Sequence, residues 1–336
     1  MATVADVAAY AGVGVGTVSR VLNGSEQVTP ETRRRVLEAM EALDYRPKRS
    51  QKREAAARQG GLVAVIIPIF DEPSTHQRLR GMVEVLKAHD LRPVLYTVTG
   101  PAEARQVLME LPEARNIDGA IVMSLPLQGS EGERLSTAGF PVVLLDTTHA
   151  DLPRVTVDDV AGGALATRHL IQLGHRRIAF VGEPAHNPMH YVASVHREEG
   201  YRRALLEAGV DVNDKYLRYG PHLQSVASQL AAELLQMAEP PTAIVTVSDV
   251  QALGVLEAAR AQGLRLPDDL SLIGYDDIDI AAFVGLSTIR QPLETSGQRA
   301  AELLIGAINS EDRPAAFSDV LPLELIVRST TGAVPR

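Results

Sequence analysis

The sequence predicts a small all-α head followed by a large α/β domain made of two parallel-sheet lobes. Apolar residues recur at helical spacing over the first 45 or so positions, whereas from Leu62 onward short apolar runs alternate with amphipathic stretches. Strands that are apolar throughout, with helices between them, are typical of parallel sheets buried on both faces. The 336 residues suffice for two domains of roughly 150 residues and one small module.

The first two helices of the head are short and separated by glycines. The first is predicted to begin after Thr3, whose hydroxyl caps it, and to end at Gly12. The second is predicted over residues 15–22, closed by Asn23 and Gly24. Two short helices joined by a tight glycine turn indicate a helix-turn-helix.

A third helix is predicted to begin at Thr29-Pro30, a capping residue followed by proline at the first helical position. Its apolar face is predicted to bury Val36, Leu37, Met40 and Leu43. Three helices of this size hold a small core and leave the second helix free to enter the major groove of DNA, which is about 12 Å wide.

The second helix carries residues that suit base recognition. Val15, Gly16 and Thr17 at its N-terminal end are predicted to face base edges, and Arg20 can donate two hydrogen bonds to guanine. In an isolated helix, a surface ion pair would explain Arg20 better. Further donors, to phosphates, are predicted at Thr3, Ser19, Asn23 and Tyr45.

The net charge of -9 divides unevenly along the chain. Residues 1–58 carry ten Lys and Arg against seven Asp and Glu, whereas the remaining residues carry 23 against 35. The basic excess lies after Tyr45. This distribution favours docking on nucleic acid by one end only.

The large part is predicted to contain two parallel sheets. Its strands are predicted at residues 62–67, 94–98, 120–123, 142–145, 178–181, 243–247 and 272–275. In such folds ligands bind beyond the carboxyl ends of the strands. Those ends are polar and acidic here, which suits hydroxyls and hydrogen-bond donors more than phosphate.

Several classes of protein are excluded. The longest clean apolar run, 62–70, is far shorter than the roughly 18 residues of a membrane span, and no export signal is visible, so a cytoplasmic protein is expected. The absence of cysteine excludes disulfides and thiolate metal sites. No catalytic motif occurs, and the sequence predicts no enzyme, no cofactor and no metal site. The acidic residues at 276, 277 and 279 are better explained by a strand-end turn than by a cation site.

Two sets of sequence runs carry a resemblance to a known family. In the head, they are the runs at 3–13, 17–24, 28–33 and 45–47. In the large part, they are residues 157–158, 173–180, 200–202, 248–249, 274–278 and 290–292. With these runs, which span nearly the whole chain, the sequence resembles the lactose-repressor/galactose-repressor (LacI/GalR) family of bacterial transcription regulators.

The resemblance implies a domain organisation. Residues 1–47 would form the helix-turn-helix DNA-binding domain, 48–61 a hinge linker, and 62–330 an effector-binding and dimerisation domain like the periplasmic sugar-binding proteins. The N-lobe would comprise about 62–160 and 291–320, and the C-lobe about 161–290 and 321–330. Effector binding between the lobes would shift their relative angle.

The hinge departs from the family pattern. A hinge leucine of the family wedges into the minor groove, but residues 48–61 contain no leucine. Lys52 and Arg53 are instead predicted to neutralise phosphates.

The resemblance also implies an effector pocket. Arg197 is similar to the family's ligand-clasping arginine and Asp249 to its hydroxyl-binding aspartate, although an ion pair between Arg197 and an acid is the alternative. Asp146 ends its strand as in the family, whereas Thr75 and His222 stand where aromatic residues often stand. The leading effector class is a sugar.

Together these features predict a ligand-responsive transcription regulator, most often a repressor in this family, that binds a pseudo-palindromic double-stranded operator as a homodimer. The resemblance places the final strand near residues 322–327, and no leucine heptad follows it, so a dimer is expected rather than a tetramer. The alternative is a small-molecule-binding protein with no specific DNA role, which would have no use for residues 1–47.

Overall fold

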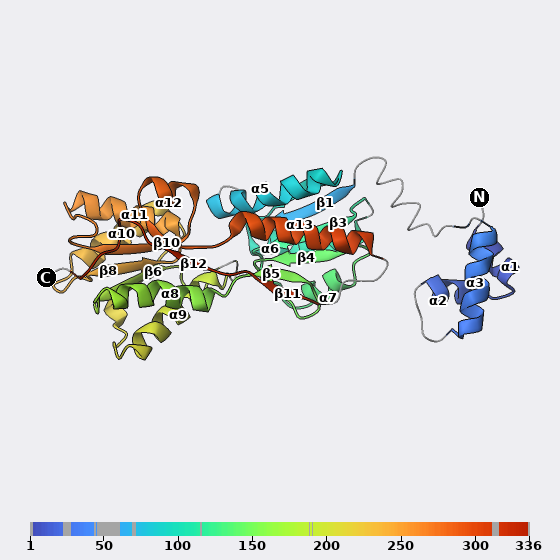
Figure 1. Ribbon diagram of the computed structural model, residues 1–336, viewed down its shortest axis with the longest axis horizontal. Coiled ribbons are helices and arrows are strands. Elements are labelled where there is room, and N and C mark those ends of the chain that lie inside the picture. Colours follow the sequence, from blue (N-terminus) through green and yellow to red (C-terminus); the bar gives the residue numbers. More distant parts are fainter. Residues whose placement is uncertain are drawn as a thin grey trace. The chain divides into compact units, whose positions relative to one another are not determined.

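The computed structural model falls into two compact units, Met1–Gly61 and Leu62–Arg336 (Figure 1). The residues that it describes are 3–22, 28–43, 45, 61–68, 72–114, 116–187, 189, 191–310 and 316–334.

The first unit contains the predicted helices. They are α1 (Val4–Ala11), α2 (Val15–Leu22) and α3 (Pro30–Ala42). The predicted caps of α1 are confirmed: the Thr3 hydroxyl accepts a hydrogen bond from the Asp6 backbone N–H, and Gly12 ends the helix in the left-handed conformation with φ 64°. The hydroxyl of Thr29 likewise accepts a hydrogen bond from the backbone N–H of Thr32, at 3.3 Å.

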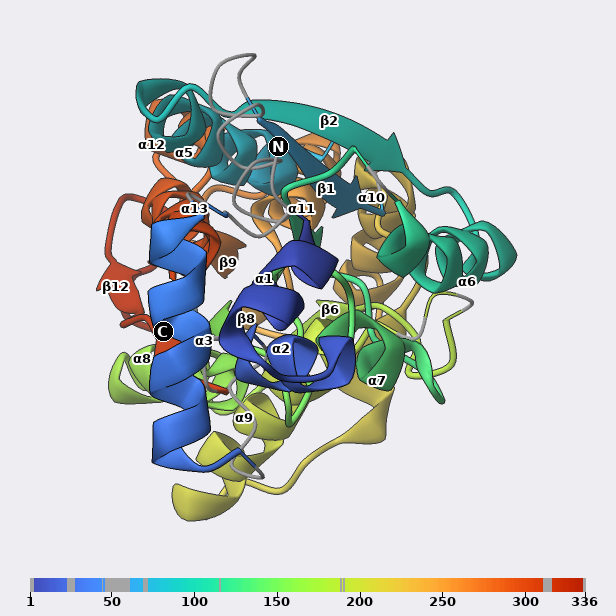
Figure 2. The same ribbon diagram turned by 90° about the vertical axis from the view of Figure 1, so that its right-hand side faces the viewer.

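The core of the head lies where the three helices meet, with α1 and α2 beside α3 (Figure 2). The predicted burial of Leu37 is wrong, because this side chain is 52% exposed on the outer face of α3. Met40 and Leu43 are partly buried. The buried apolar residues are Val7, Ala8, Ala11, Val18, Val21, Val28, Val36, Ala39 and Tyr45.

The N-lobe of the second unit is built on a six-stranded, all-parallel sheet in the order β11-β5-β4-β3-β1-β2. Helices α5 and α13 cover one face, and α6 and α7 the other. The strands are β1 (Leu62–Ile67), β2 (Arg92–Thr97), β3 (Gly119–Met123), β4 (Val142–Leu145), β5 (Arg154–Thr156) and β11 (Ser318–Val320). The helices are α5 (Pro73–Ala88), α6 (Pro101–Glu110), α7 (Glu131–Ser136) and α13 (Leu293–Asn309).

The C-lobe repeats this architecture in the order β12-β10-β9-β8-β6-β7, with β12 antiparallel to β10. Helices α8 and α9 cover one face, and α10 and α11 the other. The strands are β6 (Ile178–Gly182), β7 (Leu217–Tyr219), β8 (Ala243–Thr246), β9 (Ser271–Asp276), β10 (Ser287–Arg290) and β12 (Glu324–Ile326). The helices are α8 (Asp159–Gln172), α9 (Ala193–Glu207), α10 (Gln224–Leu235), α11 (Asp249–Ala261) and α12 (Asp279–Phe283).

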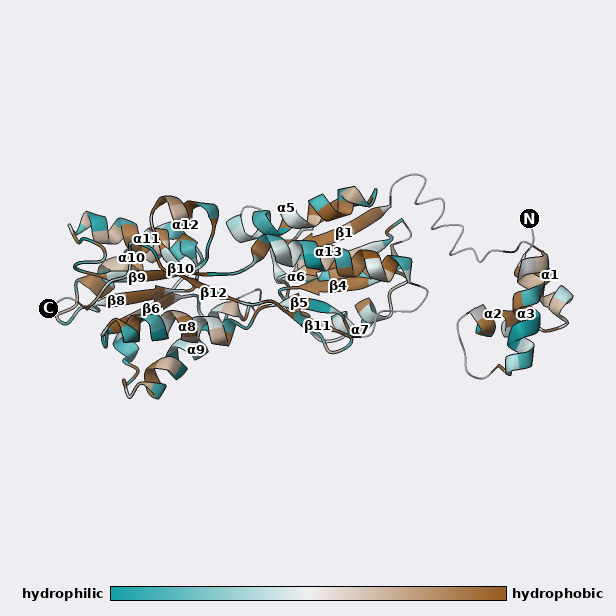
Figure 3. Cartoon of the chain, viewed as in Figure 1, coloured by the Kyte–Doolittle hydropathy of each residue, from teal (hydrophilic) through white to brown (hydrophobic). Residues whose placement is uncertain are grey.

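The central strands are the hydrophobic ones, and the outward faces of the helices are hydrophilic (Figure 3). The expectation of full burial is wrong for β2, which lies at the sheet edge with all its residues at least partly exposed. The chain passes between the lobes at residues 157–158, 291–292 and 321–323. No helix among the described residues is long and apolar enough to cross a membrane.

Candidate functional site

The exposed face of α2 is the first candidate site. Val15 is 53% exposed although it is apolar, and Gly16 and Arg20 are exposed as well, while Thr17 is half-buried. The buried side of the same helix, at Val18 and Val21, holds it against the core. Three of the four predicted base-reading residues, Val15, Gly16 and Arg20, are therefore exposed on α2, and their contact with DNA stays a prediction.

The residues predicted to contact phosphates differ in how exposed they are. Ser19 is exposed, whereas Tyr45 is only 7% exposed and packs in the core of the head, so its burial is better explained by packing than by a phosphate contact. The Thr3 hydroxyl already donates to the Asp6 carboxylate, at 2.8 Å. Asn23, Lys52 and Arg53 lie outside the described residues.

The second candidate site is a cavity of about 430 Å³ between the two lobes. It lies beyond the carboxyl ends of both sheets, the place that the fold class predicts for a ligand. Non-glycine residues with positive φ stand at three of these strand ends: Ser124 (52°), Asp146 (58°) and Asp276 (109°). Such backbone is costly and concentrates at ligand sites.

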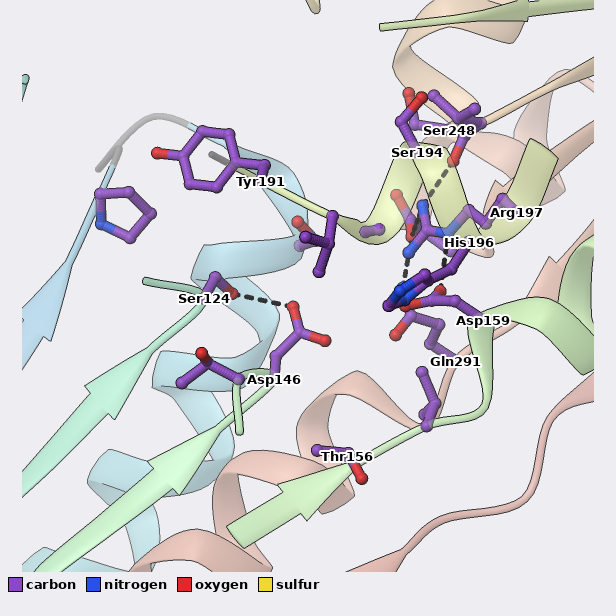
Figure 4. A pocket seen from close by; sticks show the side chains of 18 of the residues that line it. Ser124, Asp146, Thr156, Asp159, Tyr191, Ser194, His196, Arg197, Ser248 and Gln291 are labelled. Atoms are coloured by element: carbon purple, nitrogen blue, oxygen red, sulfur yellow. Dashed lines mark hydrogen bonds and ion pairs between the residues drawn. The ribbon is translucent and has the colours of Figure 1, made fainter. Parts of the chain in front are cut away.

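The N-lobe wall of the cavity centres on Asp146. Its carboxylate accepts a hydrogen bond from the Ser124 hydroxyl at 2.8 Å and lies 3.2 Å from the guanidinium of Arg78 on α5 (Figure 4). Arg78 is buried and also donates to the Gln291 side chain at 3.1 Å. Thr75, one turn earlier on α5, is buried and lines the cavity.

The C-lobe wall centres on Arg197, on α9. Its Nε donates to Asp159 at 2.7 Å, a second nitrogen donates to the carbonyl of Val247, and Asp276 lies 3.8 Å away. The guanidinium also stacks over the Tyr275 ring, with 3.7 Å from Cζ to the ring centroid. Burial alone would lower the pKa of Arg197, but Asp159 and these neighbours raise it above the ordinary arginine value.

The sequence leaves open that Arg197 forms an ion pair with an acid instead of binding a ligand. This ion pair is present, and Asp159 is the partner. It does not exclude effector binding, because Arg197 still lines the cavity.

His222 connects the two walls. Its Nε2 lies 2.5 Å from the hydroxyl of Ser248, and its Nδ1 lies 3.2 Å from the carboxylate of Glu72 in the N-lobe. Burial alone would lower the pKa of His222, but the hydrogen bond and charge of Glu72, with Glu183 and Asp276, raise it.

Ser248, His222 and Glu72 thus stand in the order of a hydrolase triad. The Ser248 hydroxyl nevertheless has a structural role. It is buried, and its hydroxyl accepts the Gln251 backbone N–H at 3.2 Å as the cap of α11. The hydrogen-bond chain therefore holds the two lobes together rather than exposing a nucleophile.

Asp249 does not belong to the cavity wall. It is completely buried below the wall, where its carboxylate accepts the Ile278 backbone N–H at 2.9 Å and the Thr288 hydroxyl at 2.7 Å. Burial raises its pKa well above the ordinary value, and the neighbouring Asp276 adds to this rise. Of the predicted effector residues, Thr75, Asp146, Arg197 and His222 line the cavity, and Asp249 does not.

Asp276, and not Asp249, is the aspartate of the C-lobe strand ends that lines the cavity. It accepts a hydrogen bond from Gln291 at 2.6 Å. Burial raises its pKa, and Arg197 opposes the rise. The signal for Asp276 is present in the sequence, as a strand-end acid, but the local pattern by itself favours a turn residue.

Both walls offer carboxylates, guanidinium groups and hydroxyls, the groups that hydrogen-bond a polyhydroxylated ligand. No cluster of ligands that could hold a metal ion occurs among the described residues.

Two family models match the chain. "Bacterial regulatory proteins, lacI family" matches residues 3–48, and "Periplasmic binding protein-like domain" matches residues 167–331.

Relatives match over the full length. The HTH-type transcriptional regulator CelR of Thermobifida fusca is 34% identical over 96% of this chain and 96% of its own. Catabolite control protein A of Priestia megaterium is 33% identical over 98% of this chain and 99% of its own.

Solved structures agree. The CelR–cellobiose complex covers 98% of this chain and 100% of its own at 32% identity and a TM-score of 0.70. The lac repressor dimer bound to operator and the anti-inducer ONPF covers 99% of both chains at 27% identity and a TM-score of 0.72.

Proposed function

This chain belongs to the lacI family of bacterial regulatory proteins, and from that premise we propose that it represses transcription from an operator under the control of a sugar effector. Its full-length relatives are transcriptional regulators, and this chain is likewise a DNA-binding transcriptional regulator and not an enzyme. This excludes the alternative of a binding protein without a DNA role. The cytoplasm is its proposed location, where the operator lies.

The observation that carries the proposal is the open face of α2, where Val15 and Arg20 are exposed while Val18 and Val21 of the same helix are buried in the core of the head. Arg20 would read a guanine, a contact worth about 1–3 kcal/mol of discrimination. The lac repressor dimer is described as bound to its operator, which supports a homodimer with one head on each half-site.

A mobility-shift assay on palindromic fragments tests this function. Arg20→Ala should bind its preferred fragment about 10- to 100-fold more weakly and discriminate less between fragments. Arg34→Ala is the matched control, because it removes the same charge from α3, where Arg34 pairs with Glu38. Equal binding of every fragment by the wild type and by Arg20→Ala would refute recognition by α2.

The hinge is proposed to bind by charge, through Lys52 and Arg53. Replacing both with alanine should lower the slope of log affinity against log salt by about 0.9 for each phosphate that the hinge no longer neutralises. An unchanged slope would contradict this role.

The effector is proposed to bind in the cavity through Thr75, Asp146, Arg197 and His222, joined by Asp276. A sugar is supported by the polar walls and by the cellobiose complex of CelR and the ribose complex of a regulator from Enterococcus faecium. Asp276→Ala should abolish the thermal stabilisation that a sugar gives to the wild type, and retention of the shift would clear this residue.

A further inference from the structure

The charges that line the cavity do not balance. Among the described residues, five carboxylates face two guanidinium groups. Both arginines are already bonded to a carboxylate, Arg78 to Asp146 and Arg197 to Asp159. The remaining carboxylates are Glu72, which pairs with His222, Asp276, which also lies within ion-pair distance of Arg197, and Glu183.

These three acids differ in their partners. Asp276 accepts a hydrogen bond from Gln291 and lies 3.8 Å from Arg197, and Glu72 faces His222 at 3.2 Å. The Glu183 carboxylate has no hydrogen-bond or ion-pair partner within the part of the chain that the structure describes. A ligand that enters the cavity removes water from this carboxylate, which is costly unless the ligand offers it a donor or a charge.

Tyr191 lines the same cavity as this unpaired acid. Its hydroxyl is buried and has no hydrogen-bond partner among the described residues. Burial raises the pKa of the Tyr191 phenol, and the charges of Glu183 and Glu72 raise it further. Figure 4 shows Tyr191 across the cavity from Arg197.

The backbone around these side chains is held firmly. The Ser194 hydroxyl accepts the Glu183 backbone N–H at 2.9 Å, and Ser194 is itself buried. The side chain of Asn187 makes two hydrogen bonds to the backbone of Tyr191, at 2.9 and 2.8 Å. These bonds hold the backbone of Glu183 and of Tyr191, while the Glu183 carboxylate and the Tyr191 hydroxyl have no partners among the described residues.

We propose that the effector carries a positively charged amino group, as an amino sugar does, and that this group binds between Glu183, Glu72 and the Tyr191 ring. Carboxylates attract an ammonium group by charge-assisted hydrogen bonds, and the face of an aromatic ring attracts it as well. The hydroxyls of the same ligand face the Arg197 and Asp146 walls. Phosphorylated or carboxylated sugars are repelled by the excess of carboxylates.

This inference rests on the proposed function, because it names the chemical class of that regulator's effector. The test is thermal shift and calorimetry on the full chain with matched sugars. The panel holds glucosamine, galactosamine and mannosamine, their N-acetyl forms and the parent hexoses, at one pH and ionic strength. At least one free amine should bind about tenfold more tightly than its parent hexose and its N-acetyl form.

Single substitutions locate the amino group. Glu183→Gln keeps the size of the side chain and removes its charge, so the ratio of amine to parent affinity should fall towards one. Glu199→Gln is the matched control, because Glu199 is an exposed acid on α9 that does not line the cavity. Tyr191→Phe keeps the ring and should lower amine affinity less than Tyr191→Leu does.

Each contrary result overturns the inference. Failure of every amine to bind, a parent or N-acetyl sugar that binds as tightly as its amine, or an unchanged ratio in Glu183→Gln would do so. The two proposals fail separately. Arg20-dependent operator binding without amine preference would reject the ligand class alone, and amine binding without operator recognition would reject the regulatory function alone.

Discussion

The two lobes of the large domain place the same chemistry on equivalent elements. In each lobe an aspartate with positive φ ends the strand beside the central one, Asp146 after β4 and Asp276 at the end of β9. In each lobe the helix that follows the first strand supplies a buried arginine, Arg78 from α5 and Arg197 from α9.

The two arginines differ in what surrounds them. Arg78 meets one carboxylate, whose side chain is 18% exposed, and one neutral amide. Arg197 meets two carboxylates, whose side chains are 11% and 8% exposed, a backbone carbonyl and an aromatic face. The repeated fold therefore supplies the positions, while the residues at the strand ends decide how much buried charge each wall must hold.

The largest expected difference is between the two arginines. Arg197→Ala leaves the buried Asp276 and the largely buried Asp159 without their cation, so the free energy of unfolding should fall by about 3–5 kcal/mol. Arg78→Ala should cost less, because the partly exposed Asp146 keeps water and the Ser124 hydroxyl. Urea unfolding of the full chain measures both.

The matched control is Arg202→Ala, on the same helix as Arg197 but 38% exposed and paired with Glu198. It should change the free energy of unfolding by less than about 1 kcal/mol. Equal losses for Arg78→Ala and Arg197→Ala would show that the two walls do not differ as described.

The two lobes also differ in the residue that comes directly after the serine at the end of a central strand, Ser124 in the N-lobe and Ser248 in the C-lobe. The residue after Ser124 is the buried Leu125, whereas the residue after Ser248 is the buried Asp249. Because the Asp249 carboxylate holds Ile278 and Thr288, Asp249→Ala should lower the free energy of unfolding by about 1.5–3 kcal/mol. Asp249→Asn should lower it less, since one acceptor remains.

The measurement is made without any sugar. If Asp249 served only to bind effector, the ligand-free stability of Asp249→Ala would equal that of the wild type, and the structural role of this carboxylate would be wrong.

Asp249 also shows where sequence reasoning reaches its limit. A polar residue just beyond a buried strand is expected near the ligand, and this places Asp146 at the cavity. The same argument cannot tell whether such a side chain points into the cavity or down into the lobe, which depends on how the next strand and turn pack. Asp249 points down because the N–H of Ile278 needs an acceptor.

The strands also divide into those that the sequence predicts and those that it does not. Central strands are apolar throughout and are predicted near their observed bounds, but the short edge strands β7 and β11 have no comparable pattern, because each has only three residues and part of each strand is exposed. The sequence does not predict the roles of Arg78 and Gln291 either. A helix and a crossover give no strand-end signal, so only the packed structure brings these residues to the cavity.

A third comparison concerns how tightly each arginine-bearing helix packs. A Cβ added at Gly297 of α13 would collide with the carbonyl oxygen of Arg78, and one added at Gly163 of α8 would collide with that of Arg197. Because backbone cannot move aside, Gly297→Ala and Gly163→Ala should each cost about 1–3 kcal/mol in unfolding experiments.

Gly306→Ala is the control for these substitutions. Gly306 lies on α13 with no atom within 4 Å of the added Cβ, so alanine should stabilise the helix by about 0.5–1 kcal/mol. If Gly297→Ala behaved like this control, the close crossing of α5 and α13 would be refuted.

The smallest expected effect lies where the two walls meet, at His222 and Glu72. The pKa of His222 is raised in the folded protein above its ordinary value near 6.5, so the protonated bridge stabilises the fold fully below that pH. The stabilisation is lost as pH rises through the raised pKa. Glu72→Gln should therefore lower the free energy of unfolding by about 0.5–1 kcal/mol at pH 6, and by less at pH 9. Urea unfolding at both pH values measures this gap, and a gap that stays constant or widens with pH would contradict a protonated link between the lobes.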